Sequence, residues 1–167
     1  MQSPEIPVGK SIDSLDFARS AGRLDGRVAL TSLPRLGDML METEGWLQLN
    51  LSGERDDEGK HWLHLELSGE LQLCCQRCLN AVAVPVAVEA HLQLVPPGTE
   101  WPDEDLEDDG ADAIAAEKEL DVLSLAEDEI LLSLPIAARH EICKLPQSAA
   151  TNESLSPFAA LAGLKMH

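Results

Sequence analysis

The sequence predicts an α+β fold in which an antiparallel β-sheet carries short flanking helices. Two long segments, residues 63–73 and 82–94, place an apolar residue at almost every second position. Such alternation buries one face of each strand, as in an antiparallel sheet. Residues 123–134 then show the apolar spacing of a helix. At 167 residues, we expect one domain spanning 1–167, built on a sheet meander, with a barrel-like closure left open.

The N-terminal residues predict three small elements. Residues 14–19 predict a short helix capped by Ser14, because a serine oxygen accepts from the first helical turn. Residues 26–30 predict a brief strand, and residues 33–40 predict a helical turn. We expect these elements to flank the sheet.

The meander is predicted to begin at the alternating segment 46–51. The polar segment 53–59 is predicted to form a turn that leads to a second strand at residues 61–73. Residues 75–79 are predicted to connect this strand to the next one. That next strand ends at Pro96, because proline cannot donate to a sheet ladder. At least three antiparallel strands follow from this order.

An acidic segment interrupts the pattern after the strands. Residues 97–116 contain eight acidic side chains between Glu100 and Asp112 and no basic one before Lys118. A block of like charge is typical of a solvated, disordered loop, so we expect a mobile acidic loop there. The alternative is a mimic of RNA phosphates that engages a basic protein.

A helix is predicted after this loop. Ser124 and Glu127 have the spacing of a capping box, and Pro135 ends the helix. Ala126, Ile130 and Leu134 fall on one face. The acidic residues 127–129 are then explained by the helix dipole rather than by catalysis.

The C-terminal residues predict a polar linker at about 147–155 and a short helix after it. Ser156 and Pro157 form a typical N-cap and first helical position, followed by an apolar stripe of Phe158, Leu161 and Leu164. This helix can dock on its own sheet or on a partner, and the pattern does not choose between the two.

The cysteines suggest a metal site. Cys75 and Cys78 form a Cys-x-x-Cys pair in the turn between strands, and His140 and Cys143 form a second pair with equal spacing. Together they make a Cys3His set suited to tetrahedral, structural zinc. The sequence gives less support to a redox function, because no thioredoxin-like βαβ pattern surrounds the Cys-x-x-Cys motif.

Composition narrows the function classes. The chain has 30 acidic and 12 basic residues, a formal net charge of -18, and only two Phe, three Trp and no Tyr. Such a chain repels the phosphate backbones of nucleic acids, and it has few aromatic side chains on which bases could stack. Basic proteins are therefore the better partners. The sequence shows no phosphate loop, dinucleotide fingerprint or nucleophile elbow, which predicts a protein that is not an enzyme.

The expected location is the cytoplasm. The N-terminal residues show no basic region followed by an apolar one, and no run approaches the roughly 20 apolar residues of a membrane span. The oligomeric state is not predicted.

Several of these segments together resemble the YceD family, described as large ribosomal RNA subunit accumulation proteins. The resemblance rests on CQRCL at 75–79, LDVLSLAEDEILLSLP at 120–135, the acidic segment between them, and SPFAALAGLK at 156–165. It implies a role in the synthesis, processing or accumulation of 23S ribosomal RNA, and hence in large-subunit biogenesis. Family genes often neighbour that of a small large-subunit ribosomal protein. Some relatives carry further C-terminal cysteines, whereas this chain has only Cys143 after the helix.

We therefore expect a non-catalytic ribosome biogenesis factor that acts through a basic ribosomal or assembly protein. Its association with ribosomal RNA is expected to be indirect, because both molecules are polyanions. The alternative is a small zinc-binding regulatory or redox module that uses the turn of Cys75 and Cys78.

Overall fold

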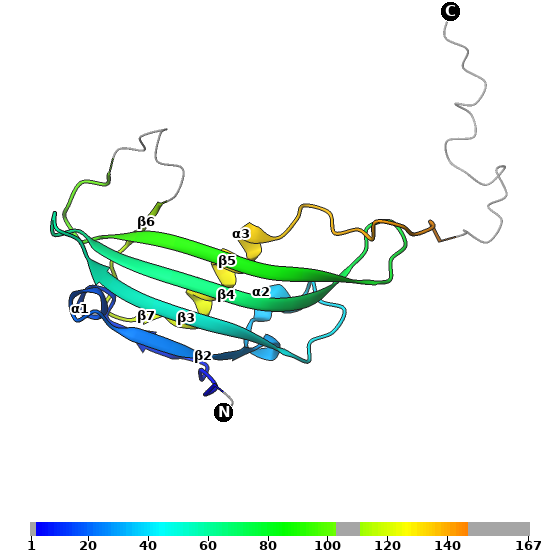
Figure 1. The fold of residues 1–167 in the computed structure, drawn as a ribbon, viewed down its shortest axis with the longest axis horizontal. Helices are drawn as coiled ribbons and strands as arrows, with labels where there is room; N and C mark the ends of the chain where they lie inside the picture. Colours follow the sequence, from blue (N-terminus) through cyan, green and yellow to red (C-terminus); the bar gives the residue numbers. More distant parts are fainter. Residues whose placement is uncertain (1–2, 103–110, 147–167) are drawn as a thin grey trace, which may run out of the picture.

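A five-stranded mixed sheet forms the body of the protein in the computed structural model, which describes residues 3–102 and 111–146 (Figure 1). Its strand order is β2-β3-β4-β5-β6. The strands are β2 (Arg23–Ala29), β3 (Trp46–Arg55), β4 (His61–Cys74), β5 (Ala81–Val95) and β6 (Asp112–Ala115). The first four form an antiparallel meander, and β6 joins β5 in parallel. The α+β prediction is confirmed; the barrel-like alternative is wrong, since β2 and β6 do not pair.

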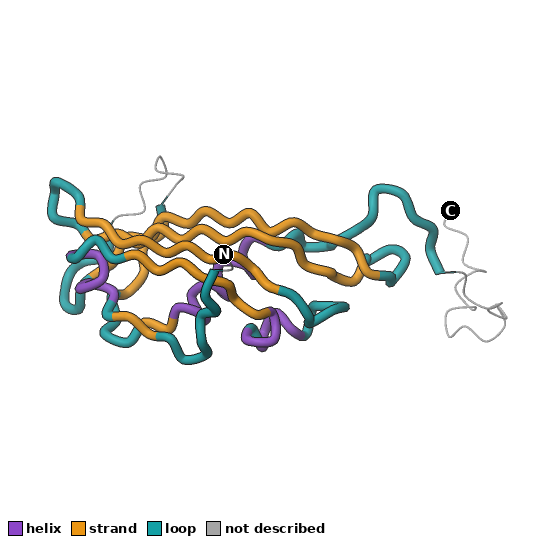
Figure 2. Tube along the Cα trace, turned by 60° about the horizontal axis from the view of Figure 1, so that its bottom comes forward, coloured by secondary structure: helices purple, strands orange, loops and turns teal. Residues whose placement is uncertain are grey.

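Short helices cover one face of this sheet (Figure 2). They are α1 (Ser14–Arg19), the 3-10 turn η1 (Leu30–Ser32), α2 (Pro34–Gly37) and α3 (Val122–Ser133). A small second sheet pairs β1 (Ser11–Ile12) with β7 (Leu120–Asp121) and so fastens the N-terminal segment to the start of α3. None of the helices in the described ranges is both long and apolar enough to cross a membrane.

The core lies between the helices and the leucine-rich face of the sheet. Alternating residues of the central strands are fully buried there, as the period-two pattern predicts. Leu49, Leu65 and Leu92 have no exposed surface, and neither has Ile130 of α3. The opposite face of the sheet carries mainly polar side chains and remains open. We call it the open face.

Both predicted helix caps are wrong by one or more residues. Asp13, not Ser14, caps α1 by accepting from the Asp16 N–H, while the buried Ser14 hydroxyl bonds the Glu117 backbone. Asp121 caps α3 by accepting from the Ser124 N–H at 2.8 Å. The helix therefore starts before Ser124, and the acidic residues 127–129 lie beyond its first turn. Pairing of β7 with β1 sets this earlier start.

The meander turn is also shorter than predicted. β3 continues through Gly53 to Arg55, because α1 packs directly against this strand. A Cβ at Gly53 would lie 2.6 Å from the Phe17 carbonyl oxygen, so only glycine allows this contact.

The predicted acidic loop of residues 97–116 is too long, because residues 112–115 form β6. Parallel pairing of Ile114 with Leu94 places these four residues, of which only Asp112 is acidic, in the sheet. Residues 103–110, the linker at 147–155 and the helix after it lie outside the described residues.

Candidate metal centre

The cysteine turn, residues 75–80, links the two longest strands. The Cys75 N–H donates to the Asn80 carbonyl at 2.9 Å, and the Leu79 N–H donates to the Cys75 carbonyl at 2.9 Å. Leu79 adopts a φ of 65°, a left-handed conformation that is uncommon for residues other than glycine. This tight turn directs the thiols of Cys75 and Cys78 toward one region.

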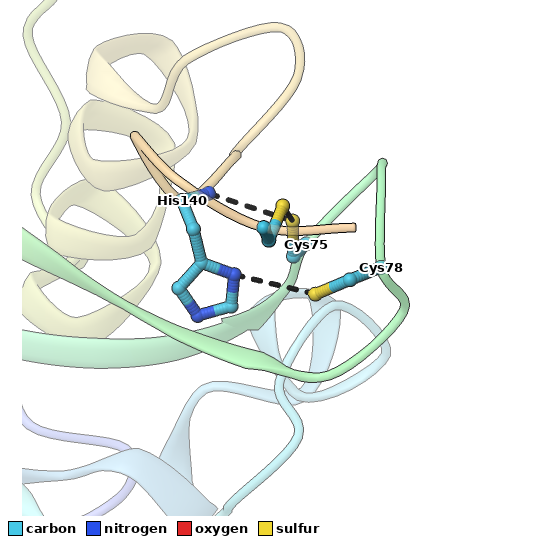
Figure 3. A group of neighbouring side chains, drawn as sticks. Cys75, Cys78 and His140 are labelled. Atoms are coloured by element: carbon cyan, nitrogen blue, oxygen red, sulfur yellow. Dashed lines mark hydrogen bonds between the residues drawn. The ribbon is translucent and has the colours of Figure 1, made fainter. Parts of the chain in front are cut away.

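The chain that follows α3 returns to this turn. The Gln76 N–H donates to the Ala138 carbonyl at 2.8 Å, and the His140 N–H lies 3.5 Å from the Cys75 sulfur. Figure 3 shows His140 lying over the turn beside both thiols. Two segments far apart in the sequence therefore meet at the end of the sheet.

Four potential ligands converge there, and we call them the Cys3His cluster: Cys75, Cys78, His140 and Cys143. Their ligand atoms all lie within 4.8 Å of one another. The sulfurs of Cys75 and Cys143 are 3.8 Å apart, and the Cys78 sulfur is 3.3 Å from His140 Nδ1. Tetrahedral zinc would separate two sulfurs by about 3.8 Å and a sulfur from an imidazole nitrogen by about 3.5 Å. The spacing thus fits zinc.

The imidazole of His140 is oriented for this role by the backbone. Its Nε2 lies 3.0 Å from the Ala81 carbonyl oxygen. A carbonyl only accepts, so Nε2 carries the proton in this bond. In the neutral ring, Nδ1 then presents a lone pair toward the Cys78 sulfur. Metal-bound histidines commonly have such an outer partner.

The surroundings of Cys75 and Cys143 shift the pKa values of these two thiols in opposite directions. Burial opposes ionisation of Cys75, but hydrogen bonds from the backbone N–H groups of Cys78, His140 and Arg77 lower its pKa to about 5. Burial and the neighbouring Cys75 and Cys78 sulfurs raise the pKa of Cys143. One thiolate is therefore ready at neutral pH, and a cation would favour deprotonation of the others.

Such a set suits a structural metal rather than a catalytic one. Four protein ligands complete a tetrahedral shell and leave no position for substrate or water. Cys74 lies outside the cluster, and its sulfur faces the carbonyls of Cys75 and Leu79 at 3.8 and 3.7 Å.

A second group of ligand-type side chains lies on the open face. His64, Glu66 and Glu89 place their ligand atoms within 4.8 Å of one another, and His64 Nε2 is 3.4 Å from Glu89 Oε1. The sequence-based prediction did not find this group. The register of the hairpin would have predicted this group. Counting outward from the cysteine turn places His64 opposite His91 and Glu66 opposite Glu89. His64 is half-buried and both glutamates are exposed, so we assign the group no site.

Glu127 is buried and has a structural role that the capping prediction missed. Its Oε1 accepts from the Leu36 N–H at 2.9 Å, and its Oε2 accepts from Arg35 Nε at 2.9 Å. The side chain is 4% exposed. It joins α3 to α2, which accounts for a buried carboxylate without any catalytic role.

The fold and the site together define a small α+β protein with an open sheet and a candidate structural metal centre at the end of that sheet. The family model described as large ribosomal RNA subunit accumulation protein YceD matches residues 63–165, so the chain belongs to the YceD family. The match covers β4 from Leu63 onward, β5, α3 and the whole Cys3His cluster. Neither the curated proteins nor the solved structures contain a match to the chain.

Proposed function

We propose that this protein is a cytoplasmic, non-catalytic factor that supports accumulation of 23S ribosomal RNA and the large subunit by binding a basic ribosomal or assembly protein. Membership of the YceD family supports the link to large-subunit RNA. The net charge of -18 is the observation that carries the choice of partner. A polyanion attracts cationic proteins and repels bare RNA.

The distribution of charge within the fold supports the same choice. β4, β5 and α3, the three longest elements that overlap the region matched by the family model, contain no Lys or Arg. Arg35, on α2, is already engaged by Glu127 and Asp128. This arrangement supports indirect association with ribosomal RNA, through a protein.

Crosslinking in cells, followed by identification of both bound protein and bound RNA, tests this proposal. We expect basic large-subunit or assembly proteins that remain bound after ribonuclease treatment. Their capture should weaken between low and moderate salt, because exposed charge pairs are screened. Capture of purified, protein-free 23S RNA by the purified chain would contradict the proposal.

The fit of the Cys3His cluster to zinc supports a second proposal, that Cys75, Cys78, His140 and Cys143 hold a structural zinc ion. Zinc would tie the segment after α3 to the cysteine turn and add to the folding energy. Metal analysis of protein purified without chelator should find about one zinc per chain.

A matched pair of variants tests the ligand assignment. Cys78→Ser should lose the zinc, whereas Cys74→Ser should retain it, because the Cys74 sulfur faces two carbonyls outside the cluster. Zinc that persists in Cys78→Ser contradicts the assignment. A zinc-free protein with a disulfide between Cys75 and Cys143 would favour the redox alternative, since their sulfurs are 3.8 Å apart.

A further inference from the structure

We propose that the exposed edge of β5, from Ala83 to Glu89, binds an extended cationic segment of the partner protein as an added strand. This inference rests on the proposed function and names the surface that performs it. β5 is 15 residues long and pairs with β4 from Ala81 to Leu94. β6 covers its other edge only from Leu92 to Val95. Within the described ranges, no strand pairs with the remaining edge, which borders the sheet in Figure 1.

The opposite edge of the sheet is treated differently. The N-terminal segment pairs with β2 at Arg27, where the Ile6 N–H donates to the Arg27 carbonyl and the Arg27 N–H donates to the Pro4 carbonyl. Exposed strand edges are templates for pairing, and proteins commonly cover them. The edge of β5 from Ala83 to Glu89 has no such pairing within the described ranges, so it is free to pair with another strand.

The hydrogen bonds of neighbouring residues show which backbone groups face this edge. The carbonyls of Ala81 and Val95 point away from β4, because they accept from His140 and from the Ala116 N–H. Backbone groups alternate between the two edges along a strand. The N–H and C=O groups of Ala83, Ala87 and Glu89 therefore point outward.

Pro85 fits the same alternation. It occupies an outward position, where the missing N–H costs no bond to β4. The proline limits uncontrolled pairing of the edge, while its own carbonyl and the groups of Ala83 and Ala87 remain available to a suitable strand. Alanine side chains beside it leave room for the backbone of an added strand.

Side chains near the edge indicate the chemistry of that strand. On the open face, Glu89 is 77% exposed, Glu66 lies opposite it, and Glu70 lies opposite Pro85. On the other face, Val84 is half-buried. An added strand with alternating cationic and apolar residues would complement both faces.

A second copy of this chain is a poorer occupant. Each copy carries a net charge of -18, and edge pairing would bring the glutamates of both copies together. A cationic segment has the opposite charge and gains attraction where a second copy would meet repulsion. The charge balance therefore selects the heterologous strand.

The test measures binding of a labelled decapeptide of alternating Lys and Val by fluorescence anisotropy. Ala83→Pro with Ala87→Pro removes two outward N–H donors, whereas Ala83→Ser with Ala87→Ser changes the same side chains and keeps the donors. We expect the proline pair to weaken binding at least about tenfold and the serine pair to change it less than about twofold. A peptide of alternating Glu and Val should not bind.

A measurement on the unaltered protein covers the case in which the proline pair fails to fold. Methylation of the amide nitrogens on the pairing edge of the Lys-Val peptide removes its donors without changing its charge. We expect this peptide to bind at least about tenfold more weakly than the unmethylated one. Equal affinity for the two peptides would overturn the proposal, as would a folded proline pair that binds like the unaltered protein.

Two further outcomes separate this inference from the proposed function. A dimer in sedimentation that dissociates in the proline pair would overturn the inference by assigning the edge to a second copy. Undiminished capture of basic proteins from cells by the proline pair would also overturn the inference, while the proposed function would stand. Failure of the unaltered chain to capture any basic protein would remove the proposed function itself.

Discussion

The buried face of the sheet and the Cys3His cluster are held together by different means. The core joins many apolar side chains from neighbouring strands, and Leu65 in β4 is one of several with no exposed surface. The cluster joins two segments that are 62 residues apart at Cys78 and His140, through a few polar contacts. Stability is therefore shared widely in the core, whereas the cluster depends on individual atoms and on the proposed metal ion.

The largest expected effect is at the core. Leu65→Ala should lower the free energy of unfolding by about 3 kcal/mol, because it removes buried methyl groups and leaves a cavity. Urea denaturation measures this change. Leu132→Ala, at a side chain that is 79% exposed, should change the value by less than about 0.5 kcal/mol. Similar losses in both variants would contradict the view that the buried face carries the stability.

The second-largest effect on stability is expected at a buried polar contact of the same core, between Glu127 and Leu36. Glu127→Ala leaves the buried Leu36 N–H without its acceptor and should cost about 2 kcal/mol. Glu127→Gln keeps an acceptor of the same shape, so its cost should be smaller, about 1 kcal/mol. Equal losses on urea denaturation would show that the negative charge, rather than the hydrogen bond to α2, matters at this position.

Removal of the proposed metal ion should affect the Cys3His cluster and leave the buried face of the sheet unchanged. A strong chelator should speed amide hydrogen exchange at residues 76–80 and 138–143, because the proposed zinc is their main link. Amides of the buried strand positions near Leu65 should keep their protection. Loss of protection across β4 and β5 would show that the cluster supports the whole sheet, and unchanged exchange at the turn would contradict a structural metal.

The smallest effect concerns Glu129, on the half-buried side of α3. Burial, with smaller contributions from Asp112 and Asp128, raises its pKa above the ordinary value of 4.5. The fold therefore favours the protonated carboxyl, and this advantage is lost as the pH rises through the folded pKa. At pH 7 Glu129→Gln should raise the thermal midpoint by about 1 °C.

The pH dependence provides the control for this prediction. The gain from Glu129→Gln should disappear as the pH falls below 4.5, since both side chains are then neutral. Glu119→Gln makes the same change of charge at an exposed position of the chain. An equal rise in thermal midpoint for both variants would assign the effect to net charge rather than to burial.

Local patterns predicted the central strands well for a simple reason. Burial of one strand face requires an apolar residue at every second position, so residues 46–51, 63–73 and 82–94 show their structure in their own sequence. Helix starts were predicted less well. Several Ser and Asp residues near each start can serve as caps, and the pairing of β1 with β7 favoured Asp121 over Ser124.

The sequence by itself determined the alternating core, the excess of negative charge and the ligand types of the Cys3His cluster, because each of these depends on residue identity and short spacing. Only the tertiary structure decided that the two ligand pairs meet, since packing of α3 against β5 returns the chain to the cysteine turn. It also decided that β6 covers just one end of β5. Contacts across such separations arise from packing and strand pairing, which short spacing does not encode.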